Sequence, residues 1–74
     1  MNISDIYLDE ECNLVSIKVN CSRWNCNKYL RKIKDQISDI EIKNILITEM
    51  KYIISAQIRV TGPYHIIIKI LRNI

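Results

Sequence analysis

The amino-acid sequence predicts a single small α+β domain over residues 1–74, folded as a two-layer sandwich with an antiparallel sheet and helices on one face. Residues 14–21 alternate apolar and polar side chains, as a half-buried strand does, and residues 23–37 carry an apolar stripe with helical period. The polar positions of residues 14–21 and 52–61 share one sheet face, so helices should cover the other. The expected order is ferredoxin-like, (β)-β-α-β-β-α, with the last strand missing or supplied by a partner.

The first two strands are expected to form a hairpin. Ile6 and Leu8 suggest a short strand, and the polar residues 9–13 then form the loop. The strand over residues 14–21 is the clearer of the two because its alternation is unbroken. Its inward side chains are predicted to be Val15, Ile17, Val19 and Cys21.

The helix over residues 23–37 has a start signal in Ser22, whose hydroxyl can cap the first turn. Cys21 then precedes the cap and Cys26 follows it at the positions of a hydrophobic staple. Trp24 and Tyr29 flank the apolar stripe of this helix, which consists of Cys26, Leu30, Ile33 and Ile37.

Residues 38–61 permit two interpretations. Ser38 and Glu41 have the spacing of a capping box, which would open a second helix. The β-branched isoleucines that follow favour a strand instead, so a strand is predicted over residues 40–49 with an irregularity near Lys43 and Asn44. Residues 49–51 are then the turn into a strand over residues 52–61. The inner face of that strand is expected to be Ile54, Ala56, Ile58 and Val60.

The pair Gly62 and Pro63 predicts a break before the last element. A helix over residues 63–74 is favoured because Pro63 fits its first position, although the isoleucine run 66–68 also suits a strand. On the helical interpretation, His65, Lys69, Arg72 and Asn73 form the polar face. The core face is then expected to be Tyr64, Ile67, Ile68, Leu71 and Ile74.

Composition argues against most catalytic chemistry. One Gly cannot build a glycine-rich phosphate loop, and one His, His65, has no acid or nucleophile at a useful spacing. The three cysteines lack zinc-knuckle spacing, and their odd number without a signal peptide indicates reduced thiols in the cytoplasm. A reactive Cys26 near Arg23 is a minor alternative. The sequence therefore predicts no enzyme activity, no metal or cofactor, no membrane span and no membrane partner.

Apolar excess points to association as the leading function. Seventeen isoleucines are hard to bury in a chain of 74 residues, so an apolar surface should be covered by a homodimer or a protein partner. The protein is therefore expected to be an interaction module or accessory subunit. The element order resembles ACT-type ligand-sensing modules and small subunits of the tRNA-modifying KEOPS complex, a resemblance of topology that residues 52–74 mostly carry and that assigns no function.

Nucleic-acid binding is the alternative function, because the net charge is +3 and the basic residues cluster. Lys28, Arg31 and Lys32 share one predicted helix stripe, where each can contact a phosphate. The candidate binding residues are Arg23, Lys28, Arg31, Lys32 and Lys34 on the helix, with Lys18 and Arg59 on the polar sheet face.

Overall fold

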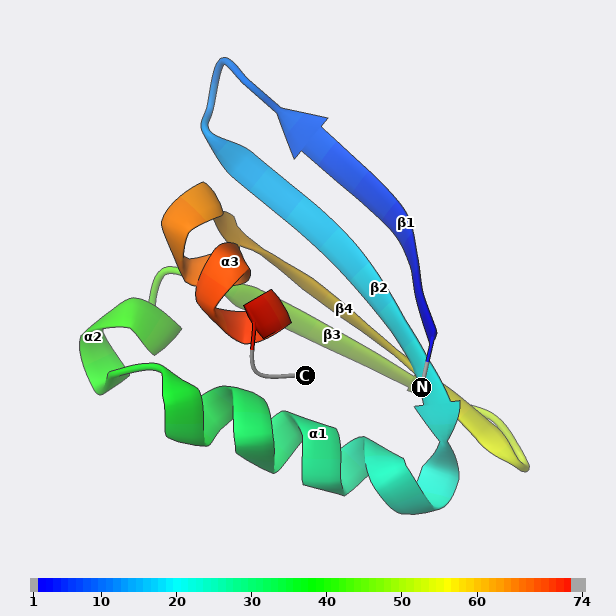
Figure 1. Cartoon of the computed structure of the whole chain (residues 1–74). Coiled ribbons are helices and arrows are strands. Elements are labelled where there is room, and N and C mark those ends of the chain that lie inside the picture. Colours follow the sequence, from blue (N-terminus) through cyan, green and yellow to red (C-terminus); the bar gives the residue numbers. More distant parts are fainter. Residues whose placement is uncertain (1, 73–74) are drawn as a thin grey trace.

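The computed structural model describes residues 2–72, and it is an α+β fold (Figure 1). A four-stranded sheet has the order β1-β2-β4-β3, and every neighbouring pair is antiparallel. The helices α1 and α3 pack on one face of β2 and β4. The elements in chain order are β1 (Asn2–Asp9), β2 (Leu14–Ser22), α1 (Arg23–Gln36), α2 (Asp39–Ile42), β3 (Leu46–Lys51), β4 (Ser55–Pro63) and α3 (Tyr64–Arg72).

The ferredoxin-like prediction is confirmed only in its coarser part, the antiparallel sheet with helices packed on it. The order β1-β2-β4-β3 differs because the strand beside β2 comes from the start of the chain rather than from a segment after α3. The sheet position expected to be empty or filled by a partner is therefore occupied by β1. The two free edges of the described sheet are β1 and β3.

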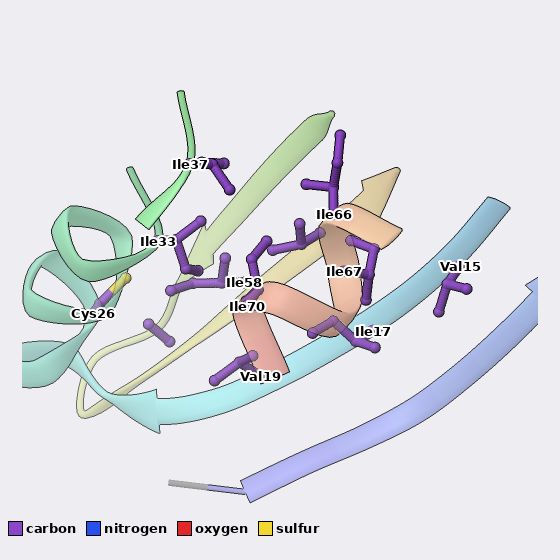
Figure 2. Packing of buried hydrophobic residues seen from close by; sticks show 12 residues of the cluster. Val15, Ile17, Val19, Cys26, Ile33, Ile37, Ile58, Ile66, Ile67 and Ile70 are labelled. Atoms are coloured by element: carbon purple, nitrogen blue, oxygen red, sulfur yellow. The ribbon is translucent and has the colours of Figure 1, made fainter. Parts of the chain in front are cut away.

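The core lies between the sheet and the two long helices. The predicted inward residues of β2 and β4 are buried, except that Cys21 is half-buried and Ile54 is exposed. Figure 2 shows Ile33 of α1 and Ile70 of α3 pointing toward Ile58 of β4. The buried cluster consists of Val15, Ile17, Val19, Cys26, Ile33, Ile37, Ala56, Ile58, Val60, Ile66, Ile67 and Ile70.

The helix α1 begins where the sequence predicts, because the Ser22 hydroxyl accepts a hydrogen bond from the Asn25 main-chain N–H at 3.4 Å. It ends one residue early, at Gln36, and Ile37 is extended and buried. Trp24 departs from the prediction most, because its side chain faces solvent instead of flanking the core.

The predicted strand over residues 40–49 is wrong in its first half, where the capping box forms instead. The Ser38 hydroxyl accepts from the Glu41 N–H at 3.2 Å, and the Glu41 carboxylate accepts from the Ser38 N–H at 3.1 Å. These bonds satisfy main-chain donors locally and outweigh the β preference of the isoleucines. The strand β3 therefore starts only at Leu46.

The turn predicted at residues 49–51 is also wrong. Those residues belong to β3, and the chain reverses at residues 52–55, where the Tyr52 N–H donates to the Ser55 carbonyl at 2.8 Å. The pairing of Lys51 with Ala56 fixes this turn. Ile54 therefore lies in the turn rather than on the inner face of β4, and 83% of it is exposed.

The last element is a helix, as predicted, but its start and its buried face differ. Pro63 ends β4 and α3 begins at Tyr64, so Pro63 is not the first helical residue. The buried face consists of Ile66, Ile67 and Ile70, while Tyr64 is half exposed. The predicted core residue Ile74 and polar residue Asn73 lie outside the described residues.

Candidate interaction surfaces

The seven basic candidates separate onto two surfaces. Arg23, Lys28, Arg31, Lys32 and Lys34 are exposed along α1, which lies on the helix side of the sheet. Lys18 and Arg59 are cross-strand neighbours on the open face, by which we mean the sheet face opposite the helices. No single flat ligand can contact both sets, because the sheet lies between them.

The outer side of α1 keeps the predicted stripe of Lys28, Arg31 and Lys32 at the surface. These three side chains border a shallow groove of about 330 Å³, together with Asn25, Tyr29 and Asp35. Asp35 also lines this groove and places a negative charge beside the basic stripe.

The two basic residues of the open face are held by a carboxylate that the sequence analysis missed. Asp5 contacts the Lys18 ammonium at 2.6 Å and the Arg59 guanidinium at 3.5 Å. The Lys18 hydrogen bond and charge, with a smaller contribution from Arg59, lower the pKa of the Asp5 carboxyl. Arg59 and Thr61 also donate to the Ser16 hydroxyl, at 2.9 and 3.0 Å. Lys18 and Arg59 are thus engaged within the sheet.

A β-bulge explains why Asp5 reaches this network. The pairing of β1 with β2 shifts register between Ser4 and Tyr7, and Asp5 adopts a left-handed conformation with φ of 49°. The bulge places Asp5 on the same face as its chain neighbour Ser4, where its carboxylate reaches Lys18 and Arg59. The positive φ of Asp5 is one that Asp and Asn tolerate better than most residues.

The thiol of Cys26 is unsuited to nucleophilic work. Burial, followed by its hydrogen bond to the Glu49 carboxylate, raises the pKa of Cys26 to about 12. The Cys21 thiol contacts Cys26, as the staple predicts, and burial raises its pKa as well. Lys51 lies 3.4 Å from Glu49 and completes this small cluster. Its chemistry is that of a packed, protonated thiol pair.

The other catalytic and metal-ligating candidates considered from the sequence do not come together in a site among the described residues. His65 is exposed on the first turn of α3. Among residues 2–72, no group of three or more His, Cys, Asp or Glu side chains is placed to hold a metal ion. No helix within that range is long and apolar enough to cross a membrane.

The edge strand β3 is an exposed and regular surface. Its pairing with β4 runs from Leu46 to Lys51 without a register shift. Leu46 and Met50 project from the open face with 66% and 55% of their surface exposed. Within the described chain, no strand covers the outer side of β3. The edge therefore combines unpaired main-chain groups with apolar side chains.

A second apolar surface lies at one end of the molecule, where the β3–β4 turn meets the start of α1 (Figure 1). We call Trp24, Ile53 and Ile54 the tip patch; they are 91%, 90% and 83% exposed, the highest fractions of any large apolar side chain described. These three side chains line a groove of about 610 Å³ together with Arg23 and Asn27. The apolar pattern of the sequence assigns Trp24 and Ile54 to the core side and therefore gives no sign of this patch.

Comparison of the chain with protein-family models, with curated proteins and with solved structures finds no match.

Proposed function

We propose that the protein is a non-enzymatic interaction module of the cytoplasm that acts by self-association, as a homodimer in which β3 pairs antiparallel with β3 of a second copy. The observation that carries this proposal is the regular, exposed edge of β3 with its two projecting apolar side chains. Strand addition at such an edge satisfies main-chain groups and buries apolar surface together.

The alternation of hydrogen-bonded and non-bonded residue pairs along the β3–β4 hairpin supports the edge of β3 as the binding strand. Tyr52 and Ser55 form a hydrogen-bonded pair, and bonded and non-bonded pairs alternate along an antiparallel ladder. Thr48 therefore directs its main-chain groups to β4, whereas Ile47 and Glu49 direct theirs outward. These outward groups are the ones available to a second copy.

Side-chain chemistry favours one register, with Thr48 on the two-fold axis. Ile47 then pairs with Glu49 of the second copy, and Leu46 lies opposite Met50 on the open face, where each covers the other. A register centred on Glu49 would place two carboxylates directly opposite each other, which is unfavourable. A register centred on Met50 would run the ladder into the turn and leave Leu46 uncovered.

A pair of matched variants tests the proposal. Leu46→Lys with Met50→Lys places charges in the proposed interface, so light scattering should show a monomer or a dimer weakened by roughly a hundredfold. Ile6→Lys with Leu8→Lys makes the same change at two exposed apolar positions of β1 and should leave the dimer intact. A monomeric wild type, or a dimer lost only in the β1 variant, contradicts the proposal.

Nucleic-acid binding by α1 is the second candidate, favoured by the exposed stripe of Lys28, Arg31 and Lys32. Changing all three to Gln should weaken binding to every sequence alike and reduce the salt slope by about three phosphate contacts. Changing Lys18 and Arg59 to Gln is the matched control. An unchanged salt slope in the triple variant excludes α1 as the contact surface.

A further inference from the structure

We propose that the tip patch is a peripheral docking site for an anionic lipid bilayer, with Trp24, Ile53 and Ile54 entering the interface and Arg23 and Lys51 contacting acidic headgroups. This inference stands apart from the strand-pairing proposal. It departs from the expectation of no membrane partner, which addressed spanning segments only, because interfacial docking needs no span.

The side chains of the patch have the chemistry of an interfacial anchor. Trp24 is amphipathic and suits the headgroup level, and the two isoleucines supply aliphatic surface for the acyl boundary. All three are more than four-fifths exposed, so docking requires no unfolding of the core. Tyr52 lines the groove beside the isoleucines, but its hydroxyl donates to the Met50 sulfur at 2.8 Å, so the anchor consists of Trp24 and the two isoleucines.

Charge complementarity selects an anionic surface as the occupant. Arg23 and Lys51 line the grooves around the isoleucines, and the described lining of both grooves contains no acidic residue. Lys51 lies 3.4 Å from Glu49 but keeps 42% of its side chain exposed, so it can face outward from that pair. Each cation near an anionic leaflet adds about 1 kcal/mol of attraction.

The charge distribution of the whole molecule orients the tip toward such a surface. The ladder of β2 and β4 pairs Ser22 with Ser55 at the end beside the tip, and Leu14 with Pro63 at the far end. The far end continues into the β1–β2 loop (Figure 1), where Glu10 and Glu11 follow Asp9, the last residue of β1. An anionic bilayer attracts the basic end and repels the acidic end, which favours docking tip first.

The test uses the intrinsic fluorescence of Trp24, the only tryptophan of the chain, so the readout comes from the proposed site itself. Vesicles of equal parts phosphatidylglycerol and phosphatidylcholine should blue-shift its emission and co-sediment the protein, and vesicles of phosphatidylcholine alone should bind at least roughly tenfold more weakly. Added salt should weaken binding to the anionic vesicles because the headgroup contacts are screened.

Three variants separate the contributions. Ile53→Ser with Ile54→Ser should reduce partitioning by roughly tenfold or more, because the aliphatic surface is lost. Arg23→Gln with Lys51→Gln should weaken binding to anionic vesicles only. Ile40→Ser is the matched control, since Ile40 is also an exposed isoleucine but lies on α2, away from the patch.

The outcomes that overturn the proposal are distinct. Wild-type protein that gives neither a blue shift nor co-sedimentation with anionic vesicles refutes it. Binding that survives the isoleucine variant but fails when Lys28, Arg31 and Lys32 are neutralised assigns the contact to α1 instead. Light scattering without lipid reports the β3 dimer separately, and loss of that dimer in the isoleucine variant would make the patch a protein interface.

Discussion

The two edge strands of this sheet resemble each other in composition and differ in regularity. Both expose large apolar side chains, Ile6 and Leu8 on β1 and Leu46 and Met50 on β3. The ladder of β1 is broken by a bulge, and its Asp5 carboxylate is fixed by Lys18 and Arg59. The ladder of β3 is unbroken along its whole length.

Exposure of apolar residues alone therefore does not define an association surface. A bulge twists an edge and disrupts the spacing of its outward N–H and C=O groups, which is how natural sheets avoid unwanted pairing. The strand β1 carries that protection and β3 does not. Association is therefore expected to occur through β3, even though the two strands expose comparable apolar surface.

The largest effect is expected from cysteine cross-linking, which tests the choice of edge and its register together. In a Cys12→Ser background, Thr48→Cys should form an intermolecular disulfide in most of the protein on mild oxidation. A non-bonded antiparallel pair brings its two Cα atoms to about 4.5 Å, within the reach of a disulfide. Non-reducing electrophoresis measures the yield.

Neighbouring positions give the controls for this cross-link. Ile47→Cys and Glu49→Cys lie off the proposed axis, so each should cross-link far less than Thr48→Cys. A maximum at residue 49 would shift the register, and a maximum at Ser4→Cys on β1 would reverse the comparison of the two edges.

The regularity of β2 and β4 was predictable from sequence because burial on one face imposes a period of two on the side chains. Ile17 and Ile58 lie in the core for that reason, and α1 follows from its stripe and its Ser22 cap. Hydrophobic pattern failed where local hydrogen bonds decide the backbone. The capping box of Ser38 and Glu41 and the hydrogen bond from Tyr52 in the β3–β4 turn set the limits of β3. The hydropathy pattern contains no signal for either feature.

The next largest effect is expected at Gly62 of β4, which packs closely against the residue before β3. A Cβ added at Gly62 would lie 2.5 Å from Cγ2 of Ile45, the residue before β3. Gly62→Ala should therefore cost roughly 1–3 kcal/mol of unfolding free energy, through overpacking rather than through backbone strain. Urea denaturation measures the loss. Adding Ile45→Ala should recover part of it, and strictly additive losses would mean that the two residues do not compete for space.

A smaller effect is expected from the helical turn that precedes β3. Ser38→Ala removes the cap of α2 and should lower the unfolding free energy by about 1 kcal/mol, while Ser38→Asp should retain most of it. The dimer should persist in both variants, because α2 lies outside the proposed ladder. If Ser38→Ala abolished the dimer at temperatures where the chain stays folded, the regularity of β3 would depend on α2.

The candidate surfaces were less predictable than the fold, since they depend on where strands end and shift register. The bulge that turns Asp5 toward Lys18 and the turn that exposes Ile54 move side chains across faces without any signal in the apolar pattern. The exposed basic stripe of α1 was predictable because a helical period alone defines it. The positive φ of Asp5 is compatible with its residue type, but that compatibility does not locate a bulge.

The smallest effect should come from the ion pair at the β1 bulge, and it should depend on pH. The pKa of Asp5 is lowered in the folded chain, so its contribution to stability is fully present above the unfolded value of about 3.9 and disappears as pH falls through the folded value. Glu41 and Glu49 also have lowered pKa values, so the wild-type pH profile sums the contributions of several carboxyls.

The difference in stability between wild type and Asp5→Asn isolates the contribution of the bulge, with Glu10→Gln in the β1–β2 loop as control. Thermal melts should show Asp5→Asn less stable than wild type at neutral pH and equal to it in acid, with a smaller gap in high salt because the pair is exposed. Equal stability of Asp5→Asn and wild type at neutral pH would mean that the bulge rests on the left-handed backbone, which Asn also tolerates, rather than on the charge, and β1 would then be protected by geometry alone.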